Sequence, residues 1–415
     1  MDRITRLRIK NVRAIESLDL EVSSLTVLIG ENGAGKSTIL ECLEILRKAS
    51  DSSFFQQLYT MHRGMHGLLR KGARSLSLGV VIEDDAHQQP RIEYGFSLVS
   101  QGAGAVVERE HLLVIRSAAD PPLRALDRNA VGGSMFDQRV GKLVPIPQEA
   151  MRPDQLVIGS FGSLPPQKAI ERLLAVLRGI EVHLRFDTLA TWAARSYQLA
   201  ASLRGSTLLQ PTDRLNLLGF NFANAWAALK NQNSSAWNET LALVRLGLGD
   251  GIDTVNVDPD AGGGNIAVSL RRFDMAEPIP AANLSDGQLS WLAFVAMARL
   301  NHGRSLLAVD EPELHLHPSL LGRVVSLLTG IDGGAPLILC THSDRVLELL
   351  DDPVSATRVC SLDGGKAVVS RIDGVELPRW LERFGDLGQL RASGYLHRVL
   401  VPAESEGPGH AETPR

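Results

Sequence analysis

The nine residues "GENGAGKST", from Gly30 to Thr38, constrain the fold of this chain more than any other stretch. They match the pattern G-x-x-x-x-G-K-[ST] in full. The apolar run "LTVLIG" precedes them, and "KSTILECLEILRK", with apolar residues at helical spacing, follows them. A buried strand, a glycine loop and a helix in direct succession are the context that this motif needs. The sequence therefore predicts an α/β domain with a phosphate-binding loop at the end of a strand.

The loop has the chemistry to hold a nucleoside triphosphate. Its glycines let backbone N–H groups curl around phosphate oxygens, and the start of the helix adds free donors and a favourable dipole. Lys36 supplies a positive charge to the β and γ phosphates, and the Ser37 hydroxyl can bind Mg²⁺. The alternative, a glycine turn that only caps a helix, is disfavoured by the lysine. We therefore expect ATP and Mg²⁺.

A second strand-like run, "SLLAVDEPE", ends in two carboxylates. An acid at the carboxyl end of a parallel strand lies beside the phosphate crevice. We expect Asp310 to bind the Mg²⁺ shell and Glu311 to orient or deprotonate the attacking water. A general base of this kind contributes about 10²–10⁴-fold to a rate. The alternative is a strand that ends in a solvated acidic turn.

The stretch "PLILCTHSD" repeats this architecture, with an apolar strand followed by Thr341 and His342. An imidazole at that strand end can donate a hydrogen bond to a γ-phosphate oxygen and so respond to hydrolysis. A lone histidine is more often structural, but its place after the next strand favours the functional interpretation.

The stretch "LSDGQ", from Leu284 to Gln288, opens a strongly apolar helical pattern. Ser285, Gly287 and Gln288 at a helix start make a second anion-binding surface. Because the glycine loop already surrounds one side of a nucleotide, this second surface suits the nucleotide of another copy. Two chains related by a twofold axis would then enclose two ATP molecules.

These motifs, in this order, resemble the ABC-class ATPases of the branch that contains SMC, RecF and OLD-type proteins. Within that branch the chain is similar to a compact bacterial group without a coiled-coil arm or a TOPRIM domain. The opening "ITRLRIKNVRAIESLDLEV" and the "AVDEPELHLHP" segment also match that group. The resemblance covers most of the chain to about residue 400, and the region between the motifs is less specific.

The resemblance implies an ATP-driven dimer with a mixed central sheet, helices on both of its faces, an N-terminal antiparallel β subdomain and a mainly helical insertion. It makes Glu311 the catalytic carboxylate and His342 the switch histidine, and it places Ser285 and Gly287 on the partner's γ-phosphate. The residues that it places along the phosphates are Gly30, Asn32, Gly33, Gly35, Lys36, Ser37 and Thr38.

Several features depart from the family pattern. Asp286 stands where a glycine is commoner; its charge would lie near a phosphate unless its side chain caps the helix instead. His315 and His317 also allow a metal site, although their spacing beside a proline is weak for one. The family's Q-loop glutamine cannot be placed. The candidates are Gln56, Gln57 and Gln101.

We divide the chain into an N-terminal lobe (1–50), a β and helical insertion (51–280), a C-terminal lobe (281–400) and a disordered tail (401–415). Within the insertion we expect strands over 75–85 and 90–100, irregular chain over 121–155, and helices over 166–184 and 234–249. We expect Trp192, Trp226 and Trp237 to be core residues rather than platforms for base stacking.

Composition bounds the partners. The formal net charge is −4, so any duplex DNA must bind a local patch. The densest basic segment is "RITRLRIKNVR", although a basic edge on a strand is more often a solvated face. No apolar run is long enough to cross a membrane, and no signal peptide is apparent. The three widely spaced cysteines predict buried thiols in a reducing cytoplasm.

The sequence favours a dimeric ATP-hydrolysing switch, in phage defence or DNA surveillance, with an effector protein from a neighbouring gene. The alternative is a RecF-like DNA clamp for repair. We give less weight to an OLD-type nuclease, because the roughly 70 residues after His342 contain no separated acidic clusters. Heptads are absent, which excludes a long coiled-coil arm.

Overall fold

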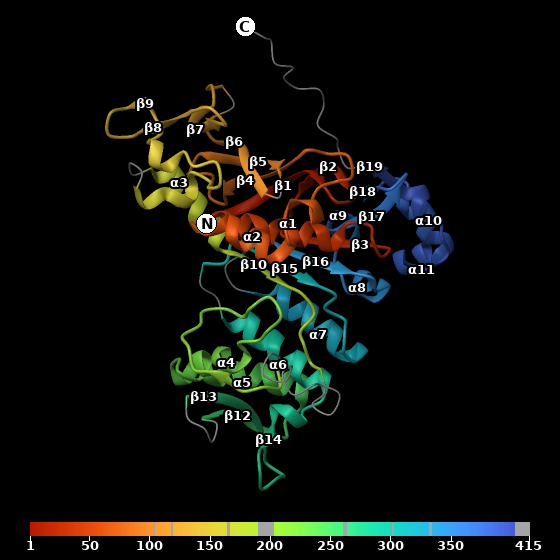
Figure 1. Ribbon diagram of the computed structural model, residues 1–415. Coiled ribbons are helices and arrows are strands. Elements are labelled where there is room, and N and C mark those ends of the chain that lie inside the picture. The colour runs from red at the N-terminus through yellow and green to blue at the C-terminus, as the bar shows by residue number, and fades with distance from the viewer. Residues whose placement is uncertain are drawn as a thin grey trace.

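The computed structural model describes residues 1–102, 104–117, 119–163, 167–189, 203–259, 264–300, 303–331 and 334–402. The strands in this part of the chain form three sheets. An eight-stranded N-terminal sheet lies at the top of Figure 1, a seven-stranded central sheet lies in the middle, and a small third sheet lies with α4 and α5 at the bottom.

The central sheet carries the glycine loop. Its order is β10-β15-β16-β3-β17-β18-β19. The first five strands pair in parallel, and the last two pair antiparallel. The strands are β10 (Ile180–His183), β15 (Leu306–Asp310), β16 (Leu337–Thr341), β3 (Leu25–Gly30), β17 (Thr357–Asp363), β18 (Lys366–Ile372) and β19 (Leu400–Pro402).

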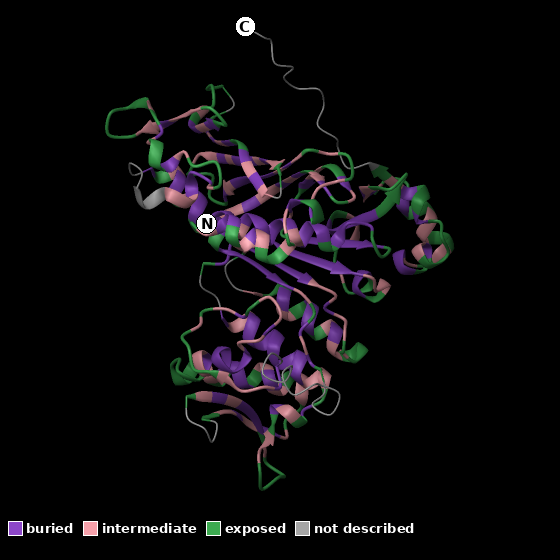
Figure 2. Cartoon of the chain, viewed as in Figure 1, coloured by how far each residue is buried: buried purple, intermediate pink, exposed green. Residues whose placement is uncertain are grey.

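Alternating residues of the central strands enter two separate hydrophobic cores. In β3, Leu28 joins one core, whereas Val27 and Ile29 join the other. The first core includes helix α1 (Lys36–Ala49), and the second includes α6 (Asp286–Arg299) and α7 (Pro318–Thr329). Figure 2 shows these strands as buried. A run that is apolar at every position is needed because helices cover both faces of the sheet.

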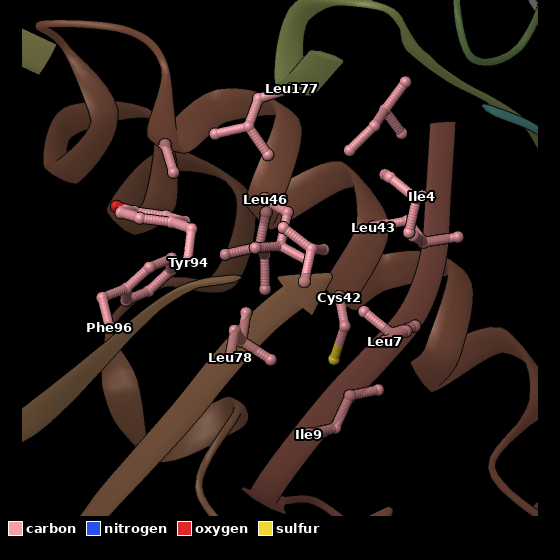
Figure 3. Close-up of a cluster of buried hydrophobic side chains, with 14 of the residues drawn as sticks. Ile4, Leu7, Ile9, Cys42, Leu43, Leu46, Leu78, Tyr94, Phe96 and Leu177 are labelled. Atoms are coloured by element: carbon pink, nitrogen blue, oxygen red, sulfur yellow. The ribbon is translucent and has the colours of Figure 1, made fainter. Parts of the chain in front are cut away.

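The N-terminal sheet is antiparallel and packs against α1. Its strands are β2 (Ile15–Glu21), β1 (Asp2–Val12), β4 (Ser75–Asp84), β5 (Arg91–Gln101), β6 (Gly104–Ile115), β7 (Leu123–Asn129), β8 (Gly133–Asp137) and β9 (Lys142–Pro145), in that spatial order. In Figure 3, Leu7 of β1, Leu78 of β4 and Phe96 of β5 face Leu43 and Leu46 of α1. Helix α1 therefore lies between two sheets, which fixes the glycine loop at its start.

The third sheet belongs to a mainly helical lobe. Its strands are β11 (Thr207–Leu208), β12 (Ile252–Pro259), β13 (Asn265–Arg272) and β14 (Ile279–Pro280). Helices α4 (Phe222–Lys230) and α5 (Ser234–Leu248) pack against α6. Gly247 of α5 has no room for a side chain, because a Cβ there would lie 2.1 Å from the Trp291 ring of α6.

The remaining helices flank these layers. They are α2 (Phe54–His62), α3 (Lys168–Arg178), α8 (Asp344–Glu348), α9 (Pro353–Ala356), α10 (Leu377–Phe384) and α11 (Leu387–Ala392). Short 3₁₀ turns are η1 (Met65–Gly67), η2 (Gln148–Ala150), η3 (Ile158–Ser163), η5 (Ala281–Asn283) and η6 (Leu396–Val399).

The predicted fold class is confirmed: the chain has a mixed central sheet with helices on both faces, an antiparallel N-terminal sheet and a mainly helical lobe. The strands expected over 75–85 and 90–100 and the helix expected over 234–249 are also present. The range 51–280, which we expected to be one insertion, contributes strands to all three sheets.

Two local predictions were wrong. The segment 121–155 is not irregular, because it forms β7, β8 and β9, which pair successively onto β6. The helix expected over 166–184 ends at Arg178, and after Gly179 the four residues Ile180–His183 form β10. Both errors have one cause: short strands that are defined by their pairing with other strands carry little periodicity of their own.

No helix in the described ranges is long and apolar enough to cross a membrane. The three cysteines are free and buried, as expected. Trp226 is fully buried, which confirms it as a core residue, and the partly buried Trp237 packs edge-on against it at the border of the core. Trp192 and most of the expected disordered tail, from residue 403 onward, lie outside the described residues.

Candidate nucleotide-binding site

The glycine loop joins β3 to α1 and depends on close backbone approach. A Cβ on Gly30 would lie 1.9 Å from the carbonyl oxygen of Cys360, which belongs to the neighbouring β17. Gly33 and Gly35 have φ values of 80° and 94°, which favour glycine. The loop therefore ends with backbone N–H groups at the start of a long buried helix, the arrangement that binds phosphate.

The other loop residues divide by exposure. Asn32 and Ser37 are exposed, whereas Lys36 and Thr38 are buried. The side-chain hydroxyl of Ser37 lies where α1 begins, facing the end of β15. The first half of the loop, residues 31–33, is exposed, whereas residues 34–36 are buried and anchor the loop in the core.

The side chain of Lys36 reaches back across the glycine loop. Its Nζ donates to the carbonyl oxygens of Gly30 at 2.8 Å and Glu31 at 2.9 Å. Burial lowers the pKa of Lys36, and the nearby acids Asp310 and Glu311 oppose that shift. A phosphate would supply the counter-charge that this partly desolvated ammonium prefers.

Asp310, the last residue of β15, faces the start of α1. The Ser37 hydroxyl donates to its Oδ2 at 3.4 Å. Burial and the charge of Glu311 raise the pKa of Asp310, and the Ser37 hydrogen bond and Lys36 partly offset them. A hydroxyl and a carboxylate at the rim of a phosphate loop are hard oxygen donors, which suit Mg²⁺.

Glu311 has an unusual backbone. Its φ is 48°, and its N–H donates to the carbonyl oxygen of Cys340 at 2.7 Å. Its Oε1 lies 3.6 Å from Nε2 of His342, at the end of β16. Strained non-glycine residues persist where the surrounding structure holds them, and they cluster at functional sites. The two side chains predicted to act on the γ-phosphate therefore lie side by side.

We call the set formed by Lys36, Ser37, Asp310, Glu311 and His342 the strand-end cluster. Its members come from the ends of three adjacent parallel strands, β15, β16 and β3, and from the start of α1. Ser37 and Asp310 are 273 positions apart in the sequence. The fold therefore brings the residues that the sequence predicts for the metal and the attacking water next to the lysine of the glycine loop, while Ser285, Gly287 and Gln288 lie at the start of α6.

Leu284–Gln288, which we call the serine turn, starts α6. Ser285 is the N-cap: its hydroxyl accepts from the Gln288 N–H at 3.3 Å, while the Gln288 side chain accepts from the Ser285 N–H at 2.9 Å. This reciprocal pair is a capping box. The alternative in which Asp286 caps the helix is wrong, because Asp286 follows the cap. Ser285 is exposed, and Gly287 and Gln288 are partly exposed.

Two family models match parts of the chain. The model described as "AAA ATPase domain" matches residues 3–94. The model described as "AAA domain, putative AbiEii toxin, Type IV TA system" matches residues 199–348. Together they include every member of the strand-end cluster and the serine turn.

Similar proteins agree with these matches. An SMC head bound to the C-winged helix domain of ScpA has a TM-score of 0.52 at 12% identity, covering 90% of this chain and 99% of that one. An SMC head with an extended coiled coil, from a complex with a ScpA domain derived from Pyrococcus furiosus, has a TM-score of 0.51 at 12% identity, covering 93% and 100%. An OLD nuclease of Thermus scotoductus is 44% identical over 43 residues, which are 10% of this chain and only 8% of that protein.

The two family matches and the shared fold support the interpretation that this chain is similar to P-loop ATPases of the RecF/SMC/OLD-like branch.

The site also contains residues around His342 that could not be identified from the sequence. Glu313 Oε1 accepts from the Thr341 hydroxyl at 2.7 Å and from the His342 N–H at 3.1 Å. Arg391 of α11 donates to the His342 carbonyl oxygen at 3.2 Å and to Asp344 at 2.5 Å. The backbone of His342 is therefore held on both sides. Only the spacing of Glu313, two residues after Glu311, could have signalled this role.

Other candidate residues lie elsewhere. His317 is the N-cap of α7, and its Nδ1 accepts from the Ser319 N–H at 3.3 Å. His315 Nδ1 lies 3.8 Å from Asp286. Among the described residues, no group of three or more histidine, cysteine or acidic side chains could hold a metal ion. This finding gives no support to the hypothesis of a metal site at His315 and His317.

The three Q-loop candidates lie outside the central sheet. Gln57 of α2 accepts from Lys48 and donates to Asp51. Gln56 belongs to the same helix, and Gln101 ends β5 of the N-terminal sheet. None of them follows a strand of the central sheet, so the position of this glutamine stays open.

Proposed function

We propose that this protein binds and hydrolyses Mg²⁺-ATP, that two copies close around two ATP molecules, and that the closed dimer is a cytoplasmic switch. Its setting would be phage defence or DNA surveillance, with an effector encoded by a neighbouring gene. The observation that carries the proposal is the placement of one phosphate-type loop, two carboxylates and an imidazole at adjacent strand ends, with an exposed capped helix start elsewhere in the chain.

Each member of the strand-end cluster has a proposed task. The loop amides and Lys36 would bind the phosphates, and Ser37 and Asp310 would hold Mg²⁺, which supplies charge neutralisation. Glu311 would orient the attacking water and accept its proton. His342, 3.6 Å from Glu311, would donate a hydrogen bond to the γ-phosphate. Such a site catalyses mainly by positioning and electrostatic stabilisation.

The serine turn supports the dimer. Its capping box fixes the first turn of α6, and Ser285 is exposed. Helix α6 packs in the second core, whereas α1 packs in the first. A helix start that presents donors on the far side of the central sheet from α1 suits the nucleotide of a second copy better than its own. Ser285, Gly287 and Gln288 would then contact the partner's γ-phosphate.

The proposed biological role rests on relatives. One matching family model is named for a toxin of a type IV toxin–antitoxin system, and one relative is named an OLD nuclease. An SMC head of the same fold binds a domain of ScpA, a separate protein. These names support a switch that works through another protein, although the chain spans only a small part of the OLD nuclease.

The test uses Glu311→Gln, which retains the size and hydrogen-bonding capacity of the side chain while removing the proton acceptor. We expect this variant to bind ATP, to hydrolyse it about 10²–10⁴-fold more slowly than the wild type, and to accumulate as a dimer. Light scattering with and without ATP measures the mass. A Glu311→Gln chain that binds ATP but stays monomeric would contradict the ATP-enclosing dimer.

One observation favours a second candidate, the RecF-like DNA clamp. A groove on the N-terminal sheet has glycines on its two middle strands and basic residues on the strands beside them. Its main lining residues are Arg8, Lys10, Gly79, Gly95, Arg109 and His111. A trough with basic walls suits a phosphodiester backbone.

The charge of this groove is partly cancelled, which is why DNA stands second. Arg8 donates to Glu93 at 3.0 Å and lies 3.5 Å from Asp19, and Arg109 lies 3.8 Å from Asp127. Fluorescence anisotropy with labelled duplex DNA and ATP tests this candidate. Binding that weakens steeply with salt and with the Lys10→Glu, Arg109→Glu double variant would favour the clamp. Salt-insensitive binding, or none, would reject it.

A further inference from the structure

The serine turn contains an acidic residue, Asp286, at the helix start where we propose that a phosphate binds. Asp286 is the first residue of α6, directly after the Ser285 cap, and its side chain is 44% exposed. A carboxylate there is favourable for the helix dipole, but it repels a phosphate that approaches the same helix start. A serine turn that meets ATP therefore needs something to cancel this charge.

Arg204 meets that need. Its Nη2 donates to Asp286 Oδ1 at 2.6 Å, in a pair whose arginine side chain is only 5% exposed. Charge-assisted hydrogen bonds of this length are among the strong ones in proteins. On its other side, Asp286 Oδ2 lies 3.8 Å from His315 Nδ1. The acid therefore has cationic or polar partners at both oxygens.

The same guanidinium also holds the backbone that leads into the turn. Its Nη1 donates to the carbonyl oxygens of Leu284 at 2.5 Å and Ala282 at 3.0 Å, and its Nε donates to that of Thr188 at 3.0 Å. Thr188 belongs to the chain that follows β10, so Arg204 links the serine turn to the edge of the central sheet. The planar guanidinium has several N–H donors in a fixed geometry and can bind all of these oxygens at once, whereas the single ammonium group of a lysine could not.

The serine turn also abuts the loop that follows Glu311. A Cβ on Gly287 would lie 3.1 Å from the carbonyl oxygen of His315, a residue with a φ of 62°. The position of the turn is thus fixed from one side by Arg204 and from the other by the backbone at His315. The space at position 287 therefore favours a residue without a side chain.

We propose that Arg204 is a positioning residue for the serine turn, which it anchors and whose Asp286 charge it cancels so that the turn can receive the partner's nucleotide. This inference rests on the proposed ATP-enclosing dimer. It assigns to a residue 81 positions before Ser285 the task of making an acidic turn suitable for an anion. Arg204 touches neither substrate nor reacting atoms in this account.

Two measurements separate anchoring from charge cancellation. Hydrogen–deuterium exchange of the 284–290 amides, without nucleotide, reports anchoring. ATP-dependent dimerisation in the Glu311→Gln background, by light scattering, reports charge. The variants are Arg204→Met, Asp286→Asn and their combination. Arg271→Met is the matched control, because it breaks an exposed arginine–aspartate pair on β13 of the same lobe.

We expect Arg204→Met to speed exchange in the turn and to weaken dimerisation by on the order of tenfold or more. Asp286→Asn alone is expected to leave dimerisation as tight as in its parent. Added to Arg204→Met, it is expected to recover most of the lost dimerisation, although exchange stays fast. A purely structural arginine would give no recovery, and that result would overturn charge cancellation. Unchanged exchange in Arg204→Met would overturn anchoring.

The parent variant keeps the two proposals distinguishable. If Glu311→Gln binds ATP without dimerising, the proposed function fails, and the exchange measurement alone decides whether Arg204 anchors the turn. If the parent dimerises while Arg204→Met dimerises equally well, the proposed function stands and the role given to Arg204 is wrong. Arg271→Met is expected to match its parent in both measurements.

Discussion

The strand-end cluster and the serine turn are built in opposite ways. The cluster exists only because the central sheet aligns strand ends from distant parts of the chain, and Lys36 at its centre is 5% exposed. The serine turn is local: four consecutive residues complete its capping box, and Ser285 at its cap is exposed. One region is closed by the fold, whereas the other presents its donors outward.

This difference indicates how the two regions divide the work. In the function that we propose, the cluster, with its buried lysine, its pair of oxygen donors for Mg²⁺ and its carboxylate, contains what one chain needs to bind a nucleotide. The exposed helix start would add donors that act only when a second copy approaches. We therefore expect loss of the phosphate-binding lysine of the cluster to abolish ATP binding, and changes in the turn to affect only assembly and turnover.

Lys36→Ala is expected to have the largest effect on this comparison. The variant removes the positive charge that we propose to face the phosphates, and we expect ATP affinity to fall by about 10–10²-fold or more. Isothermal titration with ATP measures the loss. Ser285→Ala is the control in the other region, and it is expected to bind ATP as a monomer with wild-type affinity. Wild-type affinity in Lys36→Ala would show that the glycine loop had been misread.

A buried ion cluster joins the edge strand β10 to the C-terminal end of α6, and its loss is expected to cost stability. Glu181 of β10 accepts from His183 Nε2 at 2.6 Å and from Arg304 Nε at 2.7 Å. Arg304 in turn donates to the carbonyl oxygens of Met297 and Leu300, at the end of α6. The edge of the central sheet thus holds the helix that carries the serine turn.

Glu181→Gln is expected to lower the free energy of unfolding by about 3 kcal/mol at neutral pH. Burial opposes the charge of Glu181, but the hydrogen bonds and charges of His183 and Arg304 outweigh it and lower its pKa from 4.5 to about 2. A lowered carboxyl pKa stabilises the folded state above the unfolded-state value, and this stabilisation is lost as the pH falls toward 2.

Urea unfolding at several pH values measures this contribution. The difference between the wild type and Glu181→Gln is expected to shrink between about pH 5 and about pH 3. Glu239→Gln is the matched control: this glutamate pairs with Arg299 at 2.9 Å but is 60% exposed, so its loss is expected to cost less than about 1 kcal/mol. A pH-independent difference would contradict the assigned ion pair.

Mixing two inactive variants tests whether the cluster and the serine turn of one site come from different chains. In an ATP-enclosing dimer, Lys36→Ala and Ser285→Ala chains together rebuild one complete site from the intact cluster of one chain and the intact turn of the other. Random pairing would restore about a quarter of the wild-type sites. Steady-state hydrolysis by each variant and by the mixture measures this recovery. A mixture as inactive as its components would place both regions in one chain's own site.

The sequence specified the cluster well because its residues follow strands at fixed spacing. Lys36, Asp310 and His342 each end or follow an apolar run that could be recognised without the structure. Arg204 and Arg391 could not be found in this way. Their donors reach main-chain carbonyl oxygens, and a carbonyl group leaves no mark in the sequence.

The same physical distinction explains the errors in the fold. Strands β3, β15 and β16 are apolar at successive positions because both of their faces are covered, so each was evident alone. Strand β10 has only four residues and directly follows α3, and its identity depends on parallel pairing with β15. A strand that is defined by pairing with a distant strand cannot be predicted until that pairing is known.

Glu313→Gln tests the smallest expected effect, on the positioning of His342. The carboxylate accepts from the Thr341 hydroxyl and the His342 N–H, and the amide would retain one acceptor oxygen but lose the charge. We expect kcat to fall by about tenfold or less, with ATP affinity unchanged, because only the alignment of the proposed switch histidine is loosened.

Thr341→Val removes a partner of the same Glu313 oxygen and is expected to give a similar decrease. Glu348→Gln, on the exposed side of α8, is the control and is expected to behave as the wild type. A loss of ATP affinity with kcat preserved would mean that Glu313 serves nucleotide binding in the cluster and not the histidine.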